Sequence, residues 1–182
     1  MILDFFLKTR EAQQALEQAR GRLYRMAYAW CHNAALADDL VQDTLAKALR
    51  KGGQLRDPKA RDAWLFTILA NCFRDHYRKQ RDMDDIEDVE IAVEGNPESD
   101  SSSAQIVAKV RAAIARLPEA HRQVVTLVDL EGFTYVEVAQ ILAVPIGTVM
   151  SRLCRARNAM KTMLLADFQR NPDMVAQIRR IK

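Results

Sequence analysis

The sequence predicts an all-α protein, and its composition and patterning support that fold class. Glycine and proline are few, at 6 and 5 of 182 residues, while helix formers such as Ala, Leu, Arg, Gln and Glu are abundant. The alternation of β-branched and aromatic residues that is typical of strands is nearly absent. With 49% hydrophobic residues, the chain can bury the core of one ordinary domain or of two small ones.

The charge distribution divides the chain into two basic modules joined by an acidic segment. The net charge is +3, yet residues 82–103 hold nine acidic residues and no basic one, which leaves +12 for the rest of the chain. Basic surfaces of this kind favour polyanions. The acidic segment ends in polar, turn-rich sequence that cannot offset its ordering entropy. We therefore predict a first module at 1–81, a flexible acidic linker at 82–105, a second module at 106–166 and a C-terminal tail at 167–182.

The sequence also indicates the compartment. No apolar run approaches the roughly 20 residues that a membrane helix needs, and the first ten residues show no cleavage-site pattern. Cys31, Cys72 and Cys154 are far apart and form no C-x-x-C pair, which is typical of reduced thiols. We expect a cytoplasmic protein with no integral membrane segment.

A helix expected over residues 35–51 is amphipathic and carries an acidic face. Asn33 is placed to cap its N-terminus. At 100° per residue, its apolar arc comprises Leu36, Leu40, Val41, Leu45, Ala48 and Leu49. The opposite side carries Asp39, Gln42, Asp43, Ala46 and Arg50.

The carboxylates of this helix could hold a metal, act as acids or meet a partner. Asp39 and Asp43 lie one turn apart on the same face, whereas Asp38 points about 100° away. No histidine joins them at ligand spacing, so we assign no catalytic residue, metal or cofactor. Acids in the early turns also suit the helix dipole, but that does not explain the Gln, Ala and Arg beside them.

A second helix, expected over residues 60–81, combines a core face with a basic face. The core face comprises Leu65, Ile68, Leu69, Cys72, Phe73 and His76. The other face carries Thr67, Asn71, Arg74, Arg78 and Arg81, with Trp64 at its edge. Cations, an amide and aromatics on one surface suit contact with single-stranded nucleic acid, although a solvated basic face would look the same.

Residues 117–164 have the pattern of a helix-turn-helix. Pro118 suits a helix start, and Thr134 with Glu137 forms a capping-box signature. The last helix is expected to turn Val149, Leu153, Ala156, Met160, Met163 and Leu164 inward. Its outward face carries Thr148, Ser151, Arg155 and Asn158, flanked by Arg152. Hydroxyls and arginines on a second helix are typical of proteins that bind the DNA major groove.

These three stretches together resemble the extracytoplasmic-function (ECF) sigma factors of the sigma-70 family. The resemblance covers about residues 20–165 and rests on "ADDLVQDTLAKAL", "AWLFTILANCFRDHYRK" and "LPEAHRQVVTLVDLEGFTYVEVAQILAVPIGTVMSRLCRAR", in the family's order. It implies a sigma-2-like helical bundle and a sigma-4-like helix-turn-helix domain. It also implies a bacterial alternative sigma factor that directs promoter-specific transcription initiation under the control of an anti-sigma factor.

The resemblance further implies partners and a role for each face. Asp39, Gln42 and Asp43 would dock on the clamp helices of the largest subunit of core RNA polymerase, and the second-largest subunit would also be a partner. The minus-ten element, as single-stranded promoter DNA, would meet Trp64, Thr67, Asn71, Arg74, Arg78 and Arg81, with the loop near Gly52–Pro58. The duplex minus-thirty-five element would meet Thr148, Ser151, Arg152, Arg155 and Asn158.

Some positions depart from the family pattern. Leu45 stands where Phe is usual, Ala70 where Arg is usual, and Met150 where Lys is usual on the recognition helix. Ala143 replaces the turn glycine, at a cost of roughly 1 kcal/mol if the residue is left-handed.

Two other classes of function remain as alternatives. One is a dimeric helix-turn-helix repressor or activator, which would bind symmetric duplex sites without polymerase. The other is a metal-dependent hydrolase that uses Asp38, Asp39 and Asp43, which the geometry of the helix disfavours.

Overall fold

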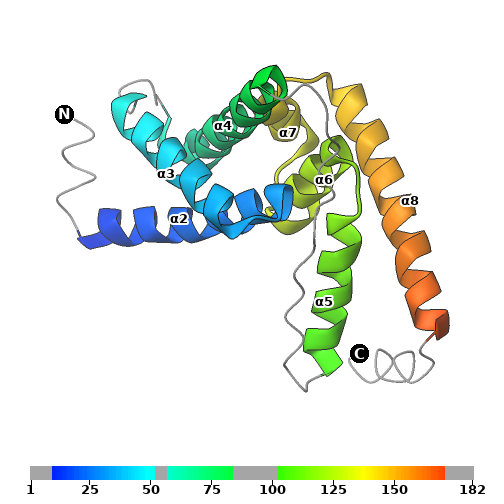
Figure 1. Ribbon diagram of the computed structural model, residues 1–182. Helices are drawn as coiled ribbons and strands as arrows, with labels where there is room; N and C mark the ends of the chain where they lie inside the picture. Colours follow the sequence, from blue (N-terminus) through cyan, green and yellow to red (C-terminus); the bar gives the residue numbers. More distant parts are fainter. Residues whose placement is uncertain (1–9, 52–56, 84–101, 171–182) are drawn as a thin grey trace.

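The computed structural model describes residues 10–51, 57–83 and 102–170, and the elements within these ranges are all helical. This confirms the predicted all-α class. The helices are α2 (Arg10–Cys31), α3 (Ala34–Lys51), η2 (Pro58–Ala60), α4 (Arg61–Met83), α5 (Ser102–Ala115), α6 (Glu119–Val125), the π-helical turn η3 (Thr126–Leu130), α7 (Tyr135–Leu142) and α8 (Ile146–Arg170) (Figure 1). The predicted linker at 82–105 and tail at 167–182 lie largely outside the described residues, and α5 begins within the range predicted for the linker.

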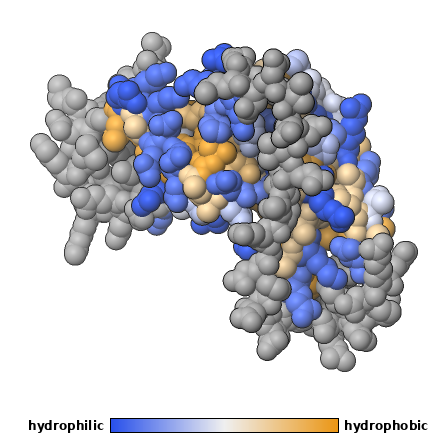
Figure 2. Space-filling view, in the orientation of Figure 1, coloured by the Kyte–Doolittle hydropathy of each residue, from blue (hydrophilic) through white to orange (hydrophobic). Residues whose placement is uncertain are grey.

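The described helices differ from a membrane span in length or composition. No single one of them is long and apolar enough to cross a bilayer, although the bent pair Tyr135–Leu142 and Ile146–Asp167 passes by length and composition alone. Figure 2 shows hydrophilic side chains together with a hydrophobic patch on the face that includes α3.

Helix boundaries follow the predicted capping signals. The backbone N–H of Leu36 donates to Asn33 Oδ1 at 2.9 Å, so Asn33 caps α3. Pro118 precedes α6 directly, and Thr134 forms a complete capping box with Glu137 at the start of α7. The polar residues at these boundaries therefore satisfy backbone N–H groups that a helix start leaves free.

The turn between α7 and α8 contains a strained residue. Ala143 adopts φ 53° and ψ 48°, the left-handed conformation, while its N–H closes the end of α7 on the carbonyls of Ala139 and Gln140. A Cβ atom disfavours this conformation by about 1–2 kcal/mol. The condition on which the sequence made the cost of Ala143 depend, a left-handed backbone, is therefore met.

Replacing this residue by glycine should stabilise the fold. Ala143→Gly removes the Cβ clash, and the extra freedom of glycine in the unfolded chain offsets part of the gain, so the expected increase in unfolding free energy is about 0.5–1 kcal/mol. Urea denaturation measures it. Ala112→Gly, at an exposed position inside α5, is the matched control and should destabilise by about 0.5–1 kcal/mol. Equal effects at both positions would contradict the strain.

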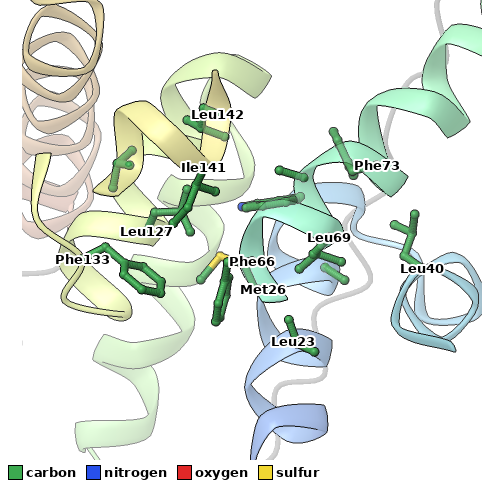
Figure 3. Close-up of a cluster of buried hydrophobic side chains, with 14 of the residues drawn as sticks. Leu23, Met26, Leu40, Phe66, Leu69, Phe73, Leu127, Phe133, Ile141 and Leu142 are labelled. Carbon is green, nitrogen blue, oxygen red and sulfur yellow. The ribbon is translucent and has the colours of Figure 1, made fainter. Parts of the chain in front are cut away.

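One continuous core joins the two ends of the chain. Figure 3 shows Phe66 and Met26, from α4 and α2, facing Leu127 and Phe133, from the C-terminal half. The rings of Phe66 and Phe133 meet edge to face at 5.1 Å between centroids. α4 also packs against α7, and α2 contacts both α5 and α6. The described parts of the two predicted modules therefore pack together in a closed arrangement.

Two residues predicted to face the core are exposed instead. Leu49 is 42% exposed because the buried face of α3 centres on the small residues Ala37 and Thr44, and Leu49 lies roughly 120° around the helix from Ala37. His76 is also exposed, and its neighbour Tyr77 takes the inward position, with its ring 4.7 Å from that of Phe73. Both predictions were wrong, because the face that is buried is rotated about the helix axis from the face that the apolar pattern indicated.

Candidate partner and nucleic-acid surfaces

The polar side of α3 presents an unneutralised acidic face. Asp39, Gln42 and Asp43 are all exposed, as is Asp38 to one side. Among the described residues, none of these carboxylates forms an ion pair, and no group of three or more potential metal ligands gathers around them. Like charges one turn apart repel each other by about 0.2–0.5 kcal/mol in an isolated helix. Among the described residues, this face therefore contributes no ion pair to the fold, and its side chains are accessible to a cationic partner.

The outer side of α4 brings three of the predicted minus-ten residues together. Asn71, Arg74 and Arg78 are exposed along successive turns. Arg74 Nη1 donates to Asn71 Oδ1 at 3.2 Å, and Arg78 pairs with Asp75 at 3.5 Å. These contacts hold two guanidinium groups and an amide on one surface.

Two other predicted minus-ten residues are only partly accessible. Trp64 is half-buried against the core, and the Thr67 hydroxyl donates to the carbonyl of Ala63 at 2.8 Å. The side chain of Arg81 and the loop residues 52–56 lie outside the described part of the chain. Among the described residues, the accessible part of this surface comprises Asn71, Arg74 and Arg78.

α7 and α8 form the predicted helix-turn-helix. The chain bends by 104° between them, across the turn of residues 143–145. This lies within the range of about 90–120° typical of the motif. Val149, Leu153 and Ala156 are buried and fix the rotation of α8 about its own axis.

The outward face of α8 carries most of the predicted minus-thirty-five residues. Ser151, Arg155 and Asn158 are exposed, whereas Thr148 and Arg152 are half-buried at the edges. Four exposed residues among the first nine of α8 were not among the predicted contacts, namely Ile146, Gly147, Met150 and Cys154. A helical wheel anchored on the buried Val149 and Leu153 would have placed Met150 outward.

A buried polar contact between α2 and α6 was missed altogether. The Trp30 indole N–H donates to the Thr126 hydroxyl at 2.9 Å, and that hydroxyl donates to the Arg122 carbonyl at 2.8 Å. In return Arg122 Nη1 donates to the Trp30 carbonyl at 2.6 Å, while Nη2 donates to Leu117 at 3.0 Å. Arg122 is only 5% exposed, and burial lowers the pKa of its guanidinium. The four-residue spacing of Arg122 and Thr126, which places both on one face of the helical segment, was the available signal.

A second polar contact lies near the two facing phenylalanines. Arg22 of α2 pairs with Asp62 at the start of α4 and, at 2.8 Å, with Glu131 after η3. Its guanidinium also lies 5.6 Å from the centroid of the Phe66 ring. Desolvation alone would lower the pKa of Arg22, but the bonds to both carboxylates outweigh it and raise that pKa. This group ties three segments together at the edge of the core.

A third contact joins the predicted minus-ten surface on α4 to the first helix of the helix-turn-helix. Arg74 Nη2, on α4, donates to the carbonyl of Leu142 at the end of α7 at 3.1 Å. In the closed arrangement, the guanidinium of Arg74 is therefore hydrogen-bonded to the helix-turn-helix.

The corner between α2 and α3 holds a neutral histidine. His32 has φ 52°, and its buried Nε2 has no hydrogen-bond partner among the described residues. Desolvation, followed by the charge of Arg122, lowers the pKa of His32 to about 4. The imidazole is therefore uncharged near neutral pH and does not repel the buried guanidinium.

Comparison with known proteins assigns both halves of the chain. Residues 15–83 match the family model for sigma-70 region 2, and residues 108–160 match that for sigma-70 region 4. The chain is 37% identical over 135 residues to the ECF RNA polymerase sigma factor EcfG of Rhodopseudomonas palustris, covering 74% of this chain and 75% of that protein. It is 35% identical over 146 residues to the RNA polymerase sigma-H factor of Pseudomonas aeruginosa, with 73% and 75% covered.

Solved structures show the same arrangement of helices. The sigma factor RpoE of Bartonella quintana, crystallised with the anti-sigma factor NepR, matches with a TM-score of 0.72 at 30% identity, over 87% of this chain and 99% of that one. CnrH, in complex with the cytosolic domain of CnrY, shares the fold with a TM-score of 0.62 at 24% identity, over 91% and 97% of the two chains.

Proposed function

Because this chain belongs to the ECF RNA polymerase sigma factors, and is thus an alternative sigma factor for transcription initiation, we propose that three exposed helix faces divide that task. Sigma factors are transcription initiation factors rather than enzymes. We therefore assign a binding role, and not a catalytic one, to each of the three faces. The observation that carries the proposal is the exposure of most of the predicted contact residues on α3, α4 and α8.

The acidic face of α3 docks on core RNA polymerase. Asp39, Gln42 and Asp43 form a compact exposed set with no neutralising partner among the described residues. Carboxylates placed this way favour a basic surface and speed the encounter with it. The partner subunits are the largest, through its clamp helices, and the second-largest.

The α4 stripe, which is the exposed surface of Asn71, Arg74 and Arg78, binds the minus-ten element as a single strand. Asn71, Arg74 and Arg78 supply an amide and two cations to the backbone and bases, and the exposed part of Trp64 supplies an aromatic edge. A surface that binds unstacked bases better than duplex shifts the promoter toward its open state. Arg74 exchanges the Leu142 carbonyl for DNA in this step.

The first turns of α8 enter the major groove at the minus-thirty-five element. Ser151, Arg155 and Asn158 point outward from the second helix of the motif, where such proteins contact base edges. Two weak DNA-binding surfaces on one polymerase gain from effective concentration, which suits domains of this size.

An anti-sigma factor controls the protein in the cytoplasm. The relative from Bartonella quintana was crystallised with its anti-sigma factor NepR and covers 87% of this chain. An inhibitor that stabilises the closed arrangement would hold Arg74 against α7 and keep the DNA surfaces together.

Run-off transcription tests the proposal. Purified core polymerase and this protein, on a promoter-bearing genomic library, should give new and discrete start sites whose upstream sequences align at both elements. A folded sample that gives no transcripts but binds symmetric duplex sites without polymerase would favour the dimeric repressor or activator instead.

Truncating one arginine should weaken minus-thirty-five recognition selectively. Arg155→Ala is expected to cost about 1–3 kcal/mol on the preferred sequence, because a bidentate contact to a base edge discriminates by that amount. Binding of the polymerase complex to matched and altered elements measures it. An equal loss on every sequence would mean that Arg155 contacts only phosphate.

A further inference from the structure

The outward face of α8 has two flanks of different chemistry. Ile146 and Met150, which lie one turn apart, are 45% and 52% exposed and form an apolar flank. The other side of the same face carries Ser151 and Arg155, both exposed. In its first turns, the exposed side of α8 therefore has one apolar flank and one hydrogen-bonding flank.

Met150 has no packing role that would explain this position. The core side of α8 is filled by Val149, Leu153 and Ala156, each at most 2% exposed. Met150 lies about 100° from Val149 around the helix, and its side chain is half in water. A single exposed apolar residue is ordinary on a protein surface. This one lies in the second turn of the helix that the proposed function places in the major groove.

The major groove offers one apolar group to such a side chain. Among the four bases only thymine presents a methyl group there, at C5, whereas the other groups donate or accept hydrogen bonds. Residues near the N-terminus of a recognition helix are those that reach base edges. Met150 is the fifth residue of α8, and its flexible thioether adapts to an irregular apolar surface.

Resting on the proposed function, we infer that Met150 contacts the C5-methyl group of a thymine in the minus-thirty-five element and sets a preference for thymine at that position. Ile146 borders the contact and excludes water from it. Ser151 and Arg155, on the other flank, form the hydrogen-bonding part of the same interface. The chain thus selects promoters by a methyl group as well as by hydrogen bonds.

Replacing thymine by deoxyuridine tests this contact, because it removes only the methyl group. The duplex is the strongest promoter obtained by run-off transcription, with each thymine of the element replaced in turn, on either strand. Binding by polymerase carrying this protein should weaken about fourfold at one position, the value of one buried methyl. The same replacement should have no effect on polymerase carrying Met150→Ala or Met150→Lys.

Matched controls separate the two proposals. Deoxyuridine between the two promoter elements should change nothing, and Ser151→Ala should keep the fourfold effect of the methyl group. A wild-type complex that transcribes but tolerates deoxyuridine at every position overturns the inference and leaves the proposed function standing. A methyl effect that persists in both Met150 variants would also overturn the inference and leave the proposed function standing. A minus-thirty-five element that contains no thymine would do the same. The absence of transcripts from any promoter would overturn the proposed function itself.

Discussion

Reversing both charges of the α3 face, by Asp39→Arg together with Asp43→Arg, is expected to weaken binding to core RNA polymerase about a hundredfold or more. Both side chains are exposed and make no ion pair among the described residues, so the fold loses no contact. Two arginines placed against a basic docking surface replace attraction by repulsion, and like charges across an interface cost several kcal/mol. Each tenfold loss of affinity corresponds to about 1.4 kcal/mol.

Asp38→Arg provides the matched control on the same helix. Asp38 is also exposed but points about 100° away from Asp39, so its reversal should reduce affinity far less. Affinity is measured by titrating labelled protein with core polymerase at fixed salt, and urea denaturation checks that all variants fold alike. If the double variant bound as tightly as wild type, the docking surface would have to lie elsewhere.

Truncating Arg122 should cause the largest loss of stability, about 3 kcal/mol for Arg122→Ala. The change removes hydrogen bonds to the Trp30 and Leu117 carbonyls, and a buried polar group left without a partner costs about 1–3 kcal/mol. Arg122→Met keeps most of the volume but not the bonds, so it should also destabilise. Urea denaturation gives the free energy, and Trp30 fluorescence in a Trp64→Phe background reports the contact between α2 and α6.

Arg116→Ala is the appropriate comparison for this buried arginine. Arg116 is exposed and precedes α6, and surface substitutions of this kind usually change stability by less than about 0.5 kcal/mol. Indistinguishable effects of the two substitutions would show that the buried hydrogen bonds of Arg122 contribute nothing net.

Local signals in the sequence predicted the helices well. Asn33, Thr134 and Glu137 marked helix starts correctly because a capping side chain acts within three residues of its partner. Helical periodicity likewise predicted the outward positions of Ser151 and Arg155. It was wrong for His76 and Leu49, because the pattern of one helix does not show which part of a broad apolar arc the neighbouring helices cover.

The contacts between the two halves could not be predicted in this way. The partner of Arg122 is the backbone carbonyl of Trp30, and a carbonyl has no signature in a sequence. The engagement of Arg74 by Leu142 depends likewise on where α7 rests on α4. The predicted roles in docking and promoter binding came from the family resemblance and remain proposals for experiment.

The apolar contact between the two halves gives their separation a distinctive temperature dependence. Phe66, Phe133 and Leu127 are at most 9% exposed in the closed arrangement and would meet water if α4 and α7 moved apart. Exposing apolar surface raises the heat capacity, so the free energy of separation follows a curve with a maximum rather than a straight line. On the cold side of that maximum the hydrophobic contribution weakens. Cooling, like heating, would then release the two halves from each other.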